Sequence, residues 1–435
     1  MMAAMRTPAA RLGFGRWLAA IVAGGLGVRL LYVLALTPHL RGHGDSEYYH
    51  RLANLLADGH GFVEPGTGAA TALHPPLFPL VLSLGSVLGL DGYRAHRVIV
   101  VLVGTAAIAA VGLLGRRLGG ERAGLVAAGL AASSPVLVSA DGAVMSESLL
   151  GLLVALCAIA AYRLVDAPSL PRSAVLGALI ALAALTRGEA VLLLLLLALP
   201  VALRLRGRRG AILAVAVLAC AVVLAPWTVR TETTFERPVF LSTNEGGLIA
   251  GANCSRTYAG ADIGSWSIRC VPAGGFADES VAAERARRRG VDYARDHASR
   301  IPLVLLARLA RTFGVLQPVR QARHAEGRAA GLEVAGQVWF WLLVPLGVAG
   351  VVVLRRRGEP VSPLVAPFGL AVAATVVGYG VPRFRHPADV ALTVLAALAV
   401  DAWRAKQARG RARSALGGRA QTAAITGNSG GGLVT

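Results

Sequence analysis

The sequence predicts an all-α polytopic membrane protein. Of its 435 residues, 55% are hydrophobic and only 16% are charged, and the mean hydropathy is +0.60. A chain of this composition cannot cover itself with polar surface in water, so its apolar faces must meet lipid. Gly accounts for 52 residues, which supports this class because small side chains let membrane helices approach each other closely.

The net charge of +20 is distributed as in a membrane protein rather than as in a nucleic-acid-binding protein. Lys and Arg gather in short clusters between apolar runs, and such clusters mark the cytoplasmic loops of polytopic proteins. They lie at 116–117, 204–209, 355–357 and 404–413. No module that combines aromatic and basic residues accompanies them, so we expect no nucleic-acid partner.

Ten apolar runs are candidate spans, although several are shorter than the ~20 residues that a helix needs to cross a bilayer. They lie at 17–37, 95–114, 123–140, 144–165, 173–186, 188–203, 211–228, 333–354, 362–381 and 387–402. Counting either of two further runs, 77–90 and 301–316, as a span would move a basic cluster outside. We therefore expect these two runs to be helices that lie in the outer interface or re-enter from it, and about ten spans in total.

This topology gives a multi-pass cell-membrane protein with both ends in the cytoplasm. Residues 1–16 are the cytoplasmic N-terminus, residues 17–403 the transmembrane domain, and residues 404–435 a basic tail, disordered from about residue 414. The first run is too long for the apolar core of a signal peptide, so we expect an uncleaved span. Two large segments, 38–94 and 229–332, face outward.

The longer outer segment has two features of its own. The run RARRR at 285–289 lies outside in this topology, but loops longer than ~60 residues largely escape the charge rule. Cys254 and Cys270 share one polar stretch, and we expect a disulfide on an oxidising side of the membrane, with two free thiols as the alternative.

Asp45 is the first candidate for chemistry, in GHGDSEYYHRL at 42–52. It can cap a helix, because Asp is a favoured N-cap. It can also take a proton from an acceptor hydroxyl beside the membrane, and the two roles are compatible. His74 lies in the same outer segment, before two prolines that set a helix start. A single His is more often structural than catalytic, but this position keeps it a candidate.

Several motifs occur in an order that resembles the GT-C glycosyltransferases of the family 39 type. They are GDSEYYHRLANLLADGHGF at 44–62, HPPLFPLVL at 74–82, VMSESLLGLLVAL at 144–156 and ALTRGEAVLLL at 184–194. That group includes the protein O-mannosyltransferases and the bacterial enzymes that add aminoarabinose to lipid A. Stretches at 244–270, 307–318 and 379–399 resemble actinobacterial members, and the resemblance covers roughly 15–405.

The resemblance implies a GT-C-type helix bundle and a reaction. Members move a sugar from a polyprenyl-phosphate donor to an acceptor on the outer face, usually by one inverting displacement. Asp45 matches the acid that acts as general base. Many relatives have Asp-Glu in tandem where this chain has Asp-Ser-Glu, so Glu47 either shares this role or borders the site. Residues two apart on a helix point to different sides, which favours Asp45.

A lipid-borne leaving phosphate requires cations at the interface. Arg187 either binds this phosphate or simply pairs with Glu189. Arg383 and Arg385 either bind it or snorkel to the interface. With Asp45 as the catalytic residue, the expected substrate-binding residues are Glu47, His74, Arg187, Arg383 and Arg385.

Four other charged residues are assigned no chemistry. Arg29, inside the first run, is expected to snorkel to the outer interface. Arg308 and Arg311 lie one turn apart and hold either lipid phosphate or headgroups. Glu147 opens an apolar run, where a first-turn acid is favourable.

No His, Cys, Asp or Glu cluster has metal-ligand spacing, and no glycine-rich nucleotide fingerprint occurs. We therefore expect no cofactor, although a divalent ion at Asp45 and Glu47 stays open because some GT-C relatives use one. A transporter or flippase of lipid-linked sugars would need polar residues at mid-bilayer, and a non-catalytic envelope scaffold would need no acid–arginine group. The crowding of ionisable residues at the outer ends favours the enzyme, with its active site on the extracytoplasmic side.

Overall fold

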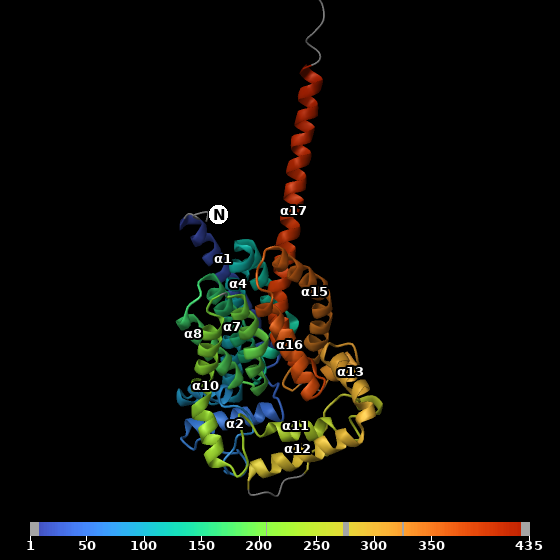
Figure 1. Cartoon of the computed structure of the whole chain (residues 1–435). Coiled ribbons are helices and arrows are strands. Elements are labelled where there is room, and N and C mark those ends of the chain that lie inside the picture. The colour runs from blue at the N-terminus through green and yellow to red at the C-terminus, as the bar shows by residue number, and fades with distance from the viewer. Residues whose placement is uncertain (1–7, 206, 273–277, 324–325, 428–435) are drawn as a thin grey trace, which may run out of the picture.

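The computed structural model describes residues 8–205, 207–272, 278–323 and 326–427. Within these residues every regular element is a helix, and a lone β-bridge pairs Val63 with Ala70. Figure 1 shows the long helices side by side in one bundle. One end carries the protruding part of α17 (His386–Gly427), and the other is covered by α2 (Asp45–Ala57), α11 (Asn244–Ala252) and α12 (Glu279–Asp296).

Five helices of the described chain are long and apolar enough to cross a membrane. The first, Gly13–Leu36, joins α1 (Pro8–Leu31) to the π-helical turn η1 (Tyr32–Leu36). The others are α4 (Tyr93–Gly119), α7 (Glu147–Asp166), α10 (Arg209–Thr234) and α15 (Ala330–Arg356). A sixth span forms if α5 (Glu121–Ser133) and α6 (Pro135–Asp141), which are bent by 61°, count as one.

The expectation of about ten spans is not confirmed. Three of the remaining apolar runs form short or broken helices, and the fourth, 387–402, lies in the long helix α17, which is not among the candidate spans. α8 (Leu170–Ala184) has 15 residues and α16 (Ser362–Val377) has 16, fewer than the ~20 that a span needs. The run at 188–203 divides into the 3₁₀ turn η2 (Gly188–Leu192), the π turn η3 (Leu194–Ala198) and α9 (Leu199–Arg204).

Close contacts between the helices depend on small residues, as expected for Gly-rich spans. A side chain at Gly177 of α8 would collide with the backbone of Ala216 on α10. One at Gly350 of α15 would collide with the backbone of Leu395 on α17. Backbone contact of this kind fixes the relative height of the helices, and with it the positions of the charged residues at their ends.

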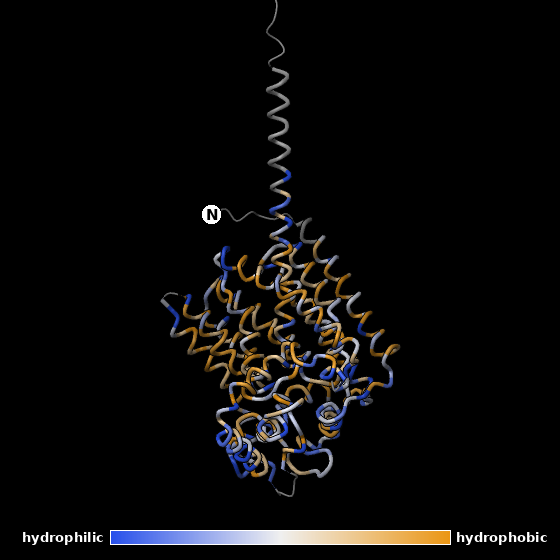
Figure 2. The backbone as a smooth tube through the Cα atoms, turned by 90° about the vertical axis from the view of Figure 1, so that its right-hand side faces the viewer, coloured by the Kyte–Doolittle hydropathy of each residue, from blue (hydrophilic) through white to orange (hydrophobic). Residues whose placement is uncertain are grey.

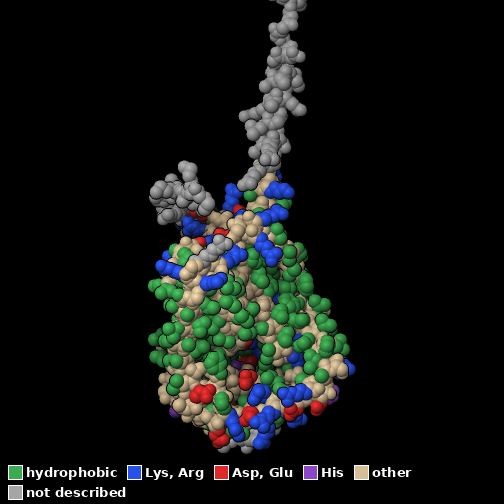
Figure 3. All heavy atoms as spheres, viewed as in Figure 1, with side chains coloured by type: hydrophobic (Ala, Val, Ile, Leu, Met, Phe, Trp, Pro, Cys, Tyr) green, Lys and Arg blue, Asp and Glu red, His purple; other side chains and the backbone are tan. Residues whose placement is uncertain are grey.

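An apolar surface surrounds the middle of the bundle. Figure 2 shows mostly hydrophobic helices there, and Figure 3 shows apolar side chains covering one face between two charged ends. Leu84 of α3 (Leu77–Val87) and Leu306 of α13 (Ile301–Thr312) are 67% and 64% exposed. With 11 and 12 residues, these two helices are too short to span and suit the membrane surface.

Arg29 is buried in the bundle, so the expected snorkelling is wrong. Its Nε donates to Asp141 Oδ2 over 2.6 Å, and Nη1 and Nη2 donate to the carbonyls of Ala132 and Ala131 over 3.2 and 3.3 Å. Pro135 at the α5–α6 bend has no N–H for the carbonyl of Ala131, so a cation from a neighbouring helix satisfies it.

The C-terminal end of the chain is helical where disorder is expected. α17 continues as a helix to Gly427, although disorder is expected from about residue 414. Ala, Arg and Gln in this stretch are good helix formers, which accounts for the difference. Residues 1–7 and 428–435 lie outside the described residues.

Candidate functional site

Asp45 opens the candidate site from the first turn of α2. Gly44, with a φ of 59°, precedes the helix, a left-handed conformation that favours Gly. Asp45 is therefore the first helical residue and not the expected N-cap. Its side chain is 33% exposed, with Oδ1 lying 3.3 Å from His74 Nε2 and Oδ2 lying 3.5 Å from Arg383 Nη2.

His74 reaches Asp45 from the loop before α3. The two prolines after His74 end the loop, and α3 begins immediately behind them, as the sequence predicts. The imidazole is buried and contacts the rings of Tyr48 and Tyr49 at centroid distances of 5.4 and 4.7 Å. These aromatic contacts hold the ring where Nε2 faces the carboxylate.

Glu147 is the buried centre of an arginine cluster. It is the first residue of α7, and its side chain is 2% exposed. Oε1 lies 3.4 Å from Arg187 Nη1 and 3.9 Å from Arg383 Nε, and Oε2 lies 3.4 Å from Arg328 Nη2. Because a buried carboxylate needs charged partners, Glu147 draws together three guanidinium groups from distant parts of the chain.

Arg187 makes the expected pair with Glu189 and a second contact as well. Its Nε donates to Glu189 Oε1 over 2.7 Å, and its Nη1 donates to Glu147 Oε1 over 3.4 Å. The guanidinium also lies 5.2 Å from the ring centre of Phe384, within cation–π range. The Glu189 pair therefore does not remove Arg187 from the cluster.

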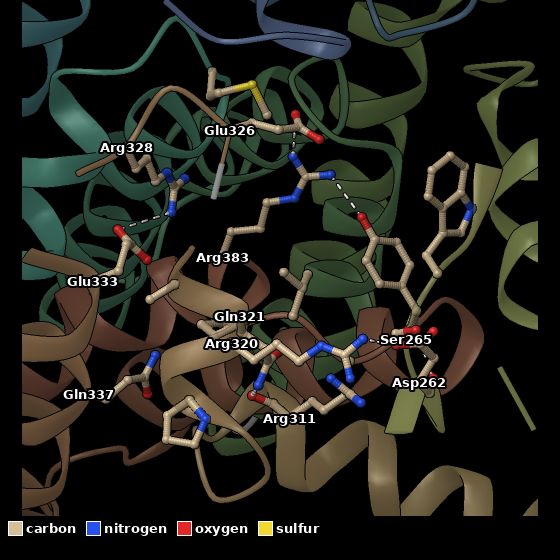
Figure 4. A pocket seen from close by; sticks show the side chains of 18 residues that line it. Asp262, Ser265, Arg311, Arg320, Gln321, Glu326, Arg328, Glu333, Gln337 and Arg383 are labelled. Carbon is tan, nitrogen blue, oxygen red and sulfur yellow. Dashed lines mark hydrogen bonds and ion pairs between the residues drawn. The ribbon is translucent and has the colours of Figure 1, made fainter. Parts of the chain in front are cut away.

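Arg383, in the 3₁₀ turn η7 (Pro382–Arg385), links the two halves of the site. Its Nη1 donates to Glu326 Oε2 over 3.2 Å and its Nη2 donates to Tyr379 Oη over 2.9 Å. Figure 4 shows the side chain directed at Glu326. The side chain is only 15% exposed, so it does not snorkel. One guanidinium thus contacts three carboxylates: Asp45, Glu147 and Glu326.

Arg385 belongs to the same turn but points away from the site. It is fully buried, its Nε donates to Asp389 Oδ1 and its Nη1 donates to Gln337 Oε1, both over 3.0 Å. The guanidinium lies 3.8 Å from the ring centre of Phe340. Side chains two apart in a tight turn diverge, so the expected phosphate-binding pair is divided. Only Arg383 enters the site, and Arg385 packs α17 against α15.

Glu47 also lies outside the cluster. Its Oε1 accepts from Arg51 Nε over 2.9 Å, and its Oε2 lies 3.5 Å from Arg41 Nη2. Two positions after Asp45 on α2, it faces another side of the helix. The substrate contact expected of Glu47, and a divalent ion shared with Asp45, therefore do not fit this geometry. In the part of the chain that is described, no three His, Cys, Asp or Glu side chains gather as metal ligands.

Two of the carboxylates that Arg383 contacts, Asp45 and Glu326, differ in proton affinity. Burial alone would raise the pKa of Asp45, but the charges of His74, Arg383 and Arg187 outweigh burial and hold this pKa well below its usual range. Burial raises the pKa of Glu326; Arg383 opposes this shift and the negative charge of Asp45 adds to it. Carboxylates whose pKa values are pushed apart are typical of acid–base sites.

A cavity of about 320 Å³ opens beside Arg383. Figure 4 shows charged and amide side chains around it, with Arg328 directed to Glu333 and Arg383 to Glu326. Asp45 and Arg187 do not line the cavity. Asp45 contacts Arg383, which does line it, and Arg187 is linked to Arg383 by their shared partner Glu147. Its polar lining includes Asp262, Gln321, Glu326, Arg328, Gln337 and Arg383.

Residues 261–266 form one wall of this cavity and are held from two sides. Arg311 donates through Nε to the carbonyl of Ile263 and through Nη2 to the carbonyl of Ala261, both over 2.6 Å. Trp266 Nε1 donates to the carbonyl of Gly247 over 3.0 Å. Arg311 therefore binds protein backbone, and the lipid-binding role expected for it does not fit these contacts.

Two further contacts close the base of this wall. Arg308 Nη2 donates to the carbonyl of Ala252 over 2.8 Å, so it too holds backbone and not lipid. A disulfide joins Cys254 to Cys270, on either side of the wall segment. Residues 261–266 thus lie in a loop that is closed by a disulfide and hydrogen-bonded to α13.

Sequence reasoning assigned no chemistry to Glu147 and did not single out Glu326, Glu333 or Arg328. Arg328 is 3% exposed and lies 3.9 Å from Glu333 Oε1, besides its contact with Glu147. Glu326, two residues earlier, faces the cavity. The sequence signal for a charged cluster was the position of Glu147 at the start of an apolar run, because a charge there requires a partner.

A family model matches part of the chain, and solved structures of similar fold cover most of it. Residues 73–232 match the family model described as dolichyl-phosphate-mannose-protein mannosyltransferase. This segment contains His74, Glu147 and Arg187, but not Asp45 or Arg383. No curated protein sequence matches the chain.

Solved structures with a similar fold include an archaeal oligosaccharyltransferase, AglB from Archaeoglobus fulgidus. In complex with an inhibitory peptide and a dolichol-phosphate it is 15% identical, with a TM-score of 0.53, over 92% of this chain and 52% of that chain. Its apo form is 16% identical, with a TM-score of 0.55, over the same shares. At such identity the likeness shows the fold alone, and the present chain spans about half the length of that protein.

A further similarity is to ArnT from Cupriavidus metallidurans bound to undecaprenyl phosphate. The two chains are 17% identical over 88% of this chain and 77% of that one, with a TM-score of 0.46. A TM-score this low carries no argument about the present chain.

Proposed function

We propose that this chain, which has the fold of the GT-C membrane glycosyltransferases, transfers a sugar from a polyprenyl-phosphate donor to an acceptor hydroxyl. The acceptor oxygen attacks the anomeric carbon while the bond from that carbon to the phosphate oxygen breaks. The phosphate leaves with the electron pair and stays on its lipid. One displacement of this kind inverts the anomeric centre.

The observation that carries the proposal is the contact of Asp45 with both His74 and Arg383. A carboxylate beside a guanidinium can receive the acceptor's proton while the guanidinium offsets the charge of the leaving phosphate. Arg187 lies in the same cluster through Glu147. Asp45 is the general base in this scheme, and Arg187 and Arg383 are the cations for the phosphate.

In the described structure both arginines are already paired with carboxylates. A donor phosphate would take the place of one of these partners, as guanidinium groups bind phosphate and carboxylate with similar geometry. The least buried partner of Arg383 is Glu326, at 37% exposed. It is therefore the one that would move most easily.

Two comparisons support a lipid phosphate as the donor. The description of the family model that matches residues 73–232 names dolichyl-phosphate-mannose. One AglB structure contains a dolichol-phosphate. The exposed leucines of α3 and α13 suit the same surface, because a lipid-borne donor must approach from the bilayer.

We place the site on the extracytoplasmic face from the distribution of charge. Arg117 pairs with Glu359, Arg357 lies 3.9 Å from Asp401, and Arg204 donates to the carbonyl of Gly358, so the basic clusters share the end of the bundle away from Asp45. By the charge rule that end is cytoplasmic. A single cysteine placed at residue 236 should react with an impermeant maleimide in intact cells, and one at residue 405 should not.

The activity is tested with purified protein in nanodiscs. Radiolabelled undecaprenyl-phosphate-linked hexoses and pentoses are supplied with an envelope extract as acceptor, and release of undecaprenyl phosphate is measured. This readout does not depend on the identity of the acceptor. Release with at least one donor, dependent on the extract, supports the proposal. No release with any donor would count against it.

A further inference from the structure

The cavity beside Arg383 has walls that suit a polar ligand. Four of its lining side chains, Arg311, Arg328, Glu333 and Gln337, are more than nine-tenths buried. Apolar residues such as Met145 and Val381 complete the lining, and the buried charged groups favour a ligand with hydroxyl groups over a polyprenyl tail. At about 320 Å³ the cavity is at the lower end of ligand-binding pockets, which hold ~300–1,000 Å³.

Glu326 stands where this cavity meets the acid of the proposed reaction. It lines the cavity, its Oε2 accepts from Arg383 Nη1 over 3.2 Å, and the same guanidinium lies 3.5 Å from Asp45 through Nη2. Asp45 itself does not line the cavity. A group entering through the cavity therefore meets Glu326 and Arg383 before it reaches Asp45.

We infer that this cavity receives the hydroxyl-bearing acceptor and that Glu326 carries the acceptor's proton out of the site. The inference rests on the proposed transferase activity. As the bond from the acceptor oxygen to the anomeric carbon forms, the O–H bond breaks and the proton passes by way of Asp45 to Glu326. The electron pair of the broken carbon–oxygen bond leaves on the lipid phosphate. Glu326 then releases the proton to water in the cavity.

The division of labour follows from the partners of the two carboxylates. Asp45 faces two cationic groups, His74 and Arg383, so it holds a proton poorly. Glu326 has one cationic contact and is closer to solvent, so it is the better site for a proton that must leave. The charged groups that face Glu326 are Arg383 of η7, Asp45 of α2, Glu147 of α7 and Arg328 of its own segment.

The pH dependence of the reaction gives the test. Burial raises the pKa of Glu326, and a proton acceptor works only when it is ionised. The rate should therefore rise with pH through the pKa of Glu326 and then level off. In Glu326→Gln this acid limb should disappear and the plateau rate should fall by about 10²–10⁴-fold. Glu326→Asp should retain the limb at a reduced rate.

The measurement uses release of undecaprenyl phosphate by full-length protein in nanodiscs between pH 4 and pH 9. Glu236→Gln is the matched control, since Glu236 is an exposed acid at the same end of the molecule. It should leave both rate and profile unchanged. Melting temperatures within a few degrees of the parent show that each variant is folded.

The outcomes separate the two proposals. An active parent whose acid limb survives in Glu326→Gln would overturn the role of Glu326 and leave the transferase standing. A parent that releases no undecaprenyl phosphate from any donor would overturn the transferase, and the role of Glu326 with it.

Discussion

Arg383 lies 3.5 Å from Asp45, although the two residues come from opposite ends of the chain. The contact joins the first turn of α2 to the turn that precedes α17. It places a carboxylate that is kept ionised next to a cation at the end of a membrane bundle. The first predictions concern these two residues.

Replacing Asp45 by Asn should lower the transfer rate by about 10²–10⁴-fold, as expected for loss of a general base. Because the pKa of Asp45 is held well below its usual range, the carboxylate is ionised throughout the neutral range. Titration of Asp45 itself should therefore not change the deficit between about pH 5 and 8, and the full deficit should be seen on the plateau above the pKa of Glu326. Undecaprenyl phosphate release across this range measures it.

Glu47→Gln is the control for Asp45→Asn, because Glu47 lies two residues away and its ion pairs within the described residues are with two surface arginines, Arg41 and Arg51. Its rate should stay within twofold of the parent. A Glu47→Gln variant as impaired as Asp45→Asn would contradict the placement of Glu47 outside the site.

Arg383→Gln and Arg385→Gln should differ in kind. Removing Arg383 should weaken binding of undecaprenyl phosphate by about tenfold or more, since a charge-assisted hydrogen bond contributes about 1.5–3 kcal/mol. Removing Arg385 should leave binding unchanged but lower stability by about 3–5 kcal/mol, because Asp389 would be left buried without its cation. Ligand titration and thermal melting separate the two. Equal losses of affinity in both variants would refute the division of this pair.

Glu147→Gln should destabilise the site without contacting substrate. Loss of the carboxylate leaves Arg187, Arg328 and Arg383 close together with less negative charge among them, so we expect a cost of about 3 kcal/mol. Glu189→Gln is the matched control. Its side chain is 27% exposed, so its pair with Arg187 should contribute about 1 kcal/mol or less. Thermal melting of both variants in nanodiscs provides the comparison.

Removing the disulfide with Cys254→Ser and Cys270→Ser should loosen the cavity wall. The bridge spans 16 positions, and closing a loop of that length contributes roughly 3 kcal/mol. Trypsin should then cut faster at Arg256 and Arg269, both exposed within the bridged loop. Unchanged cleavage rates would show that Arg311 and Trp266 hold the wall by themselves.

Local sequence was enough to predict several parts of the site. Two prolines predict the start of α3 behind His74, and an acid after the first apolar run predicts that α2 begins at Asp45 within one residue. Single residues of this kind are constrained by their neighbours in the chain, since helix starts depend on backbone geometry. That the runs of α3 and α13 do not span was predicted differently, from the placement of the basic clusters along the whole chain.

The sequence by itself determined the membrane class, the helical fold and the candidate acid at residue 45. Only the tertiary structure decided that Arg383 turns into the site and Arg385 out of it, that Glu47 faces surface arginines, and that Glu147 gathers three guanidinium groups. The physical reason is that apolar composition and helix signals act over a few residues. The partner of a buried charge is chosen by whichever distant helix ends the packing brings within about 4 Å.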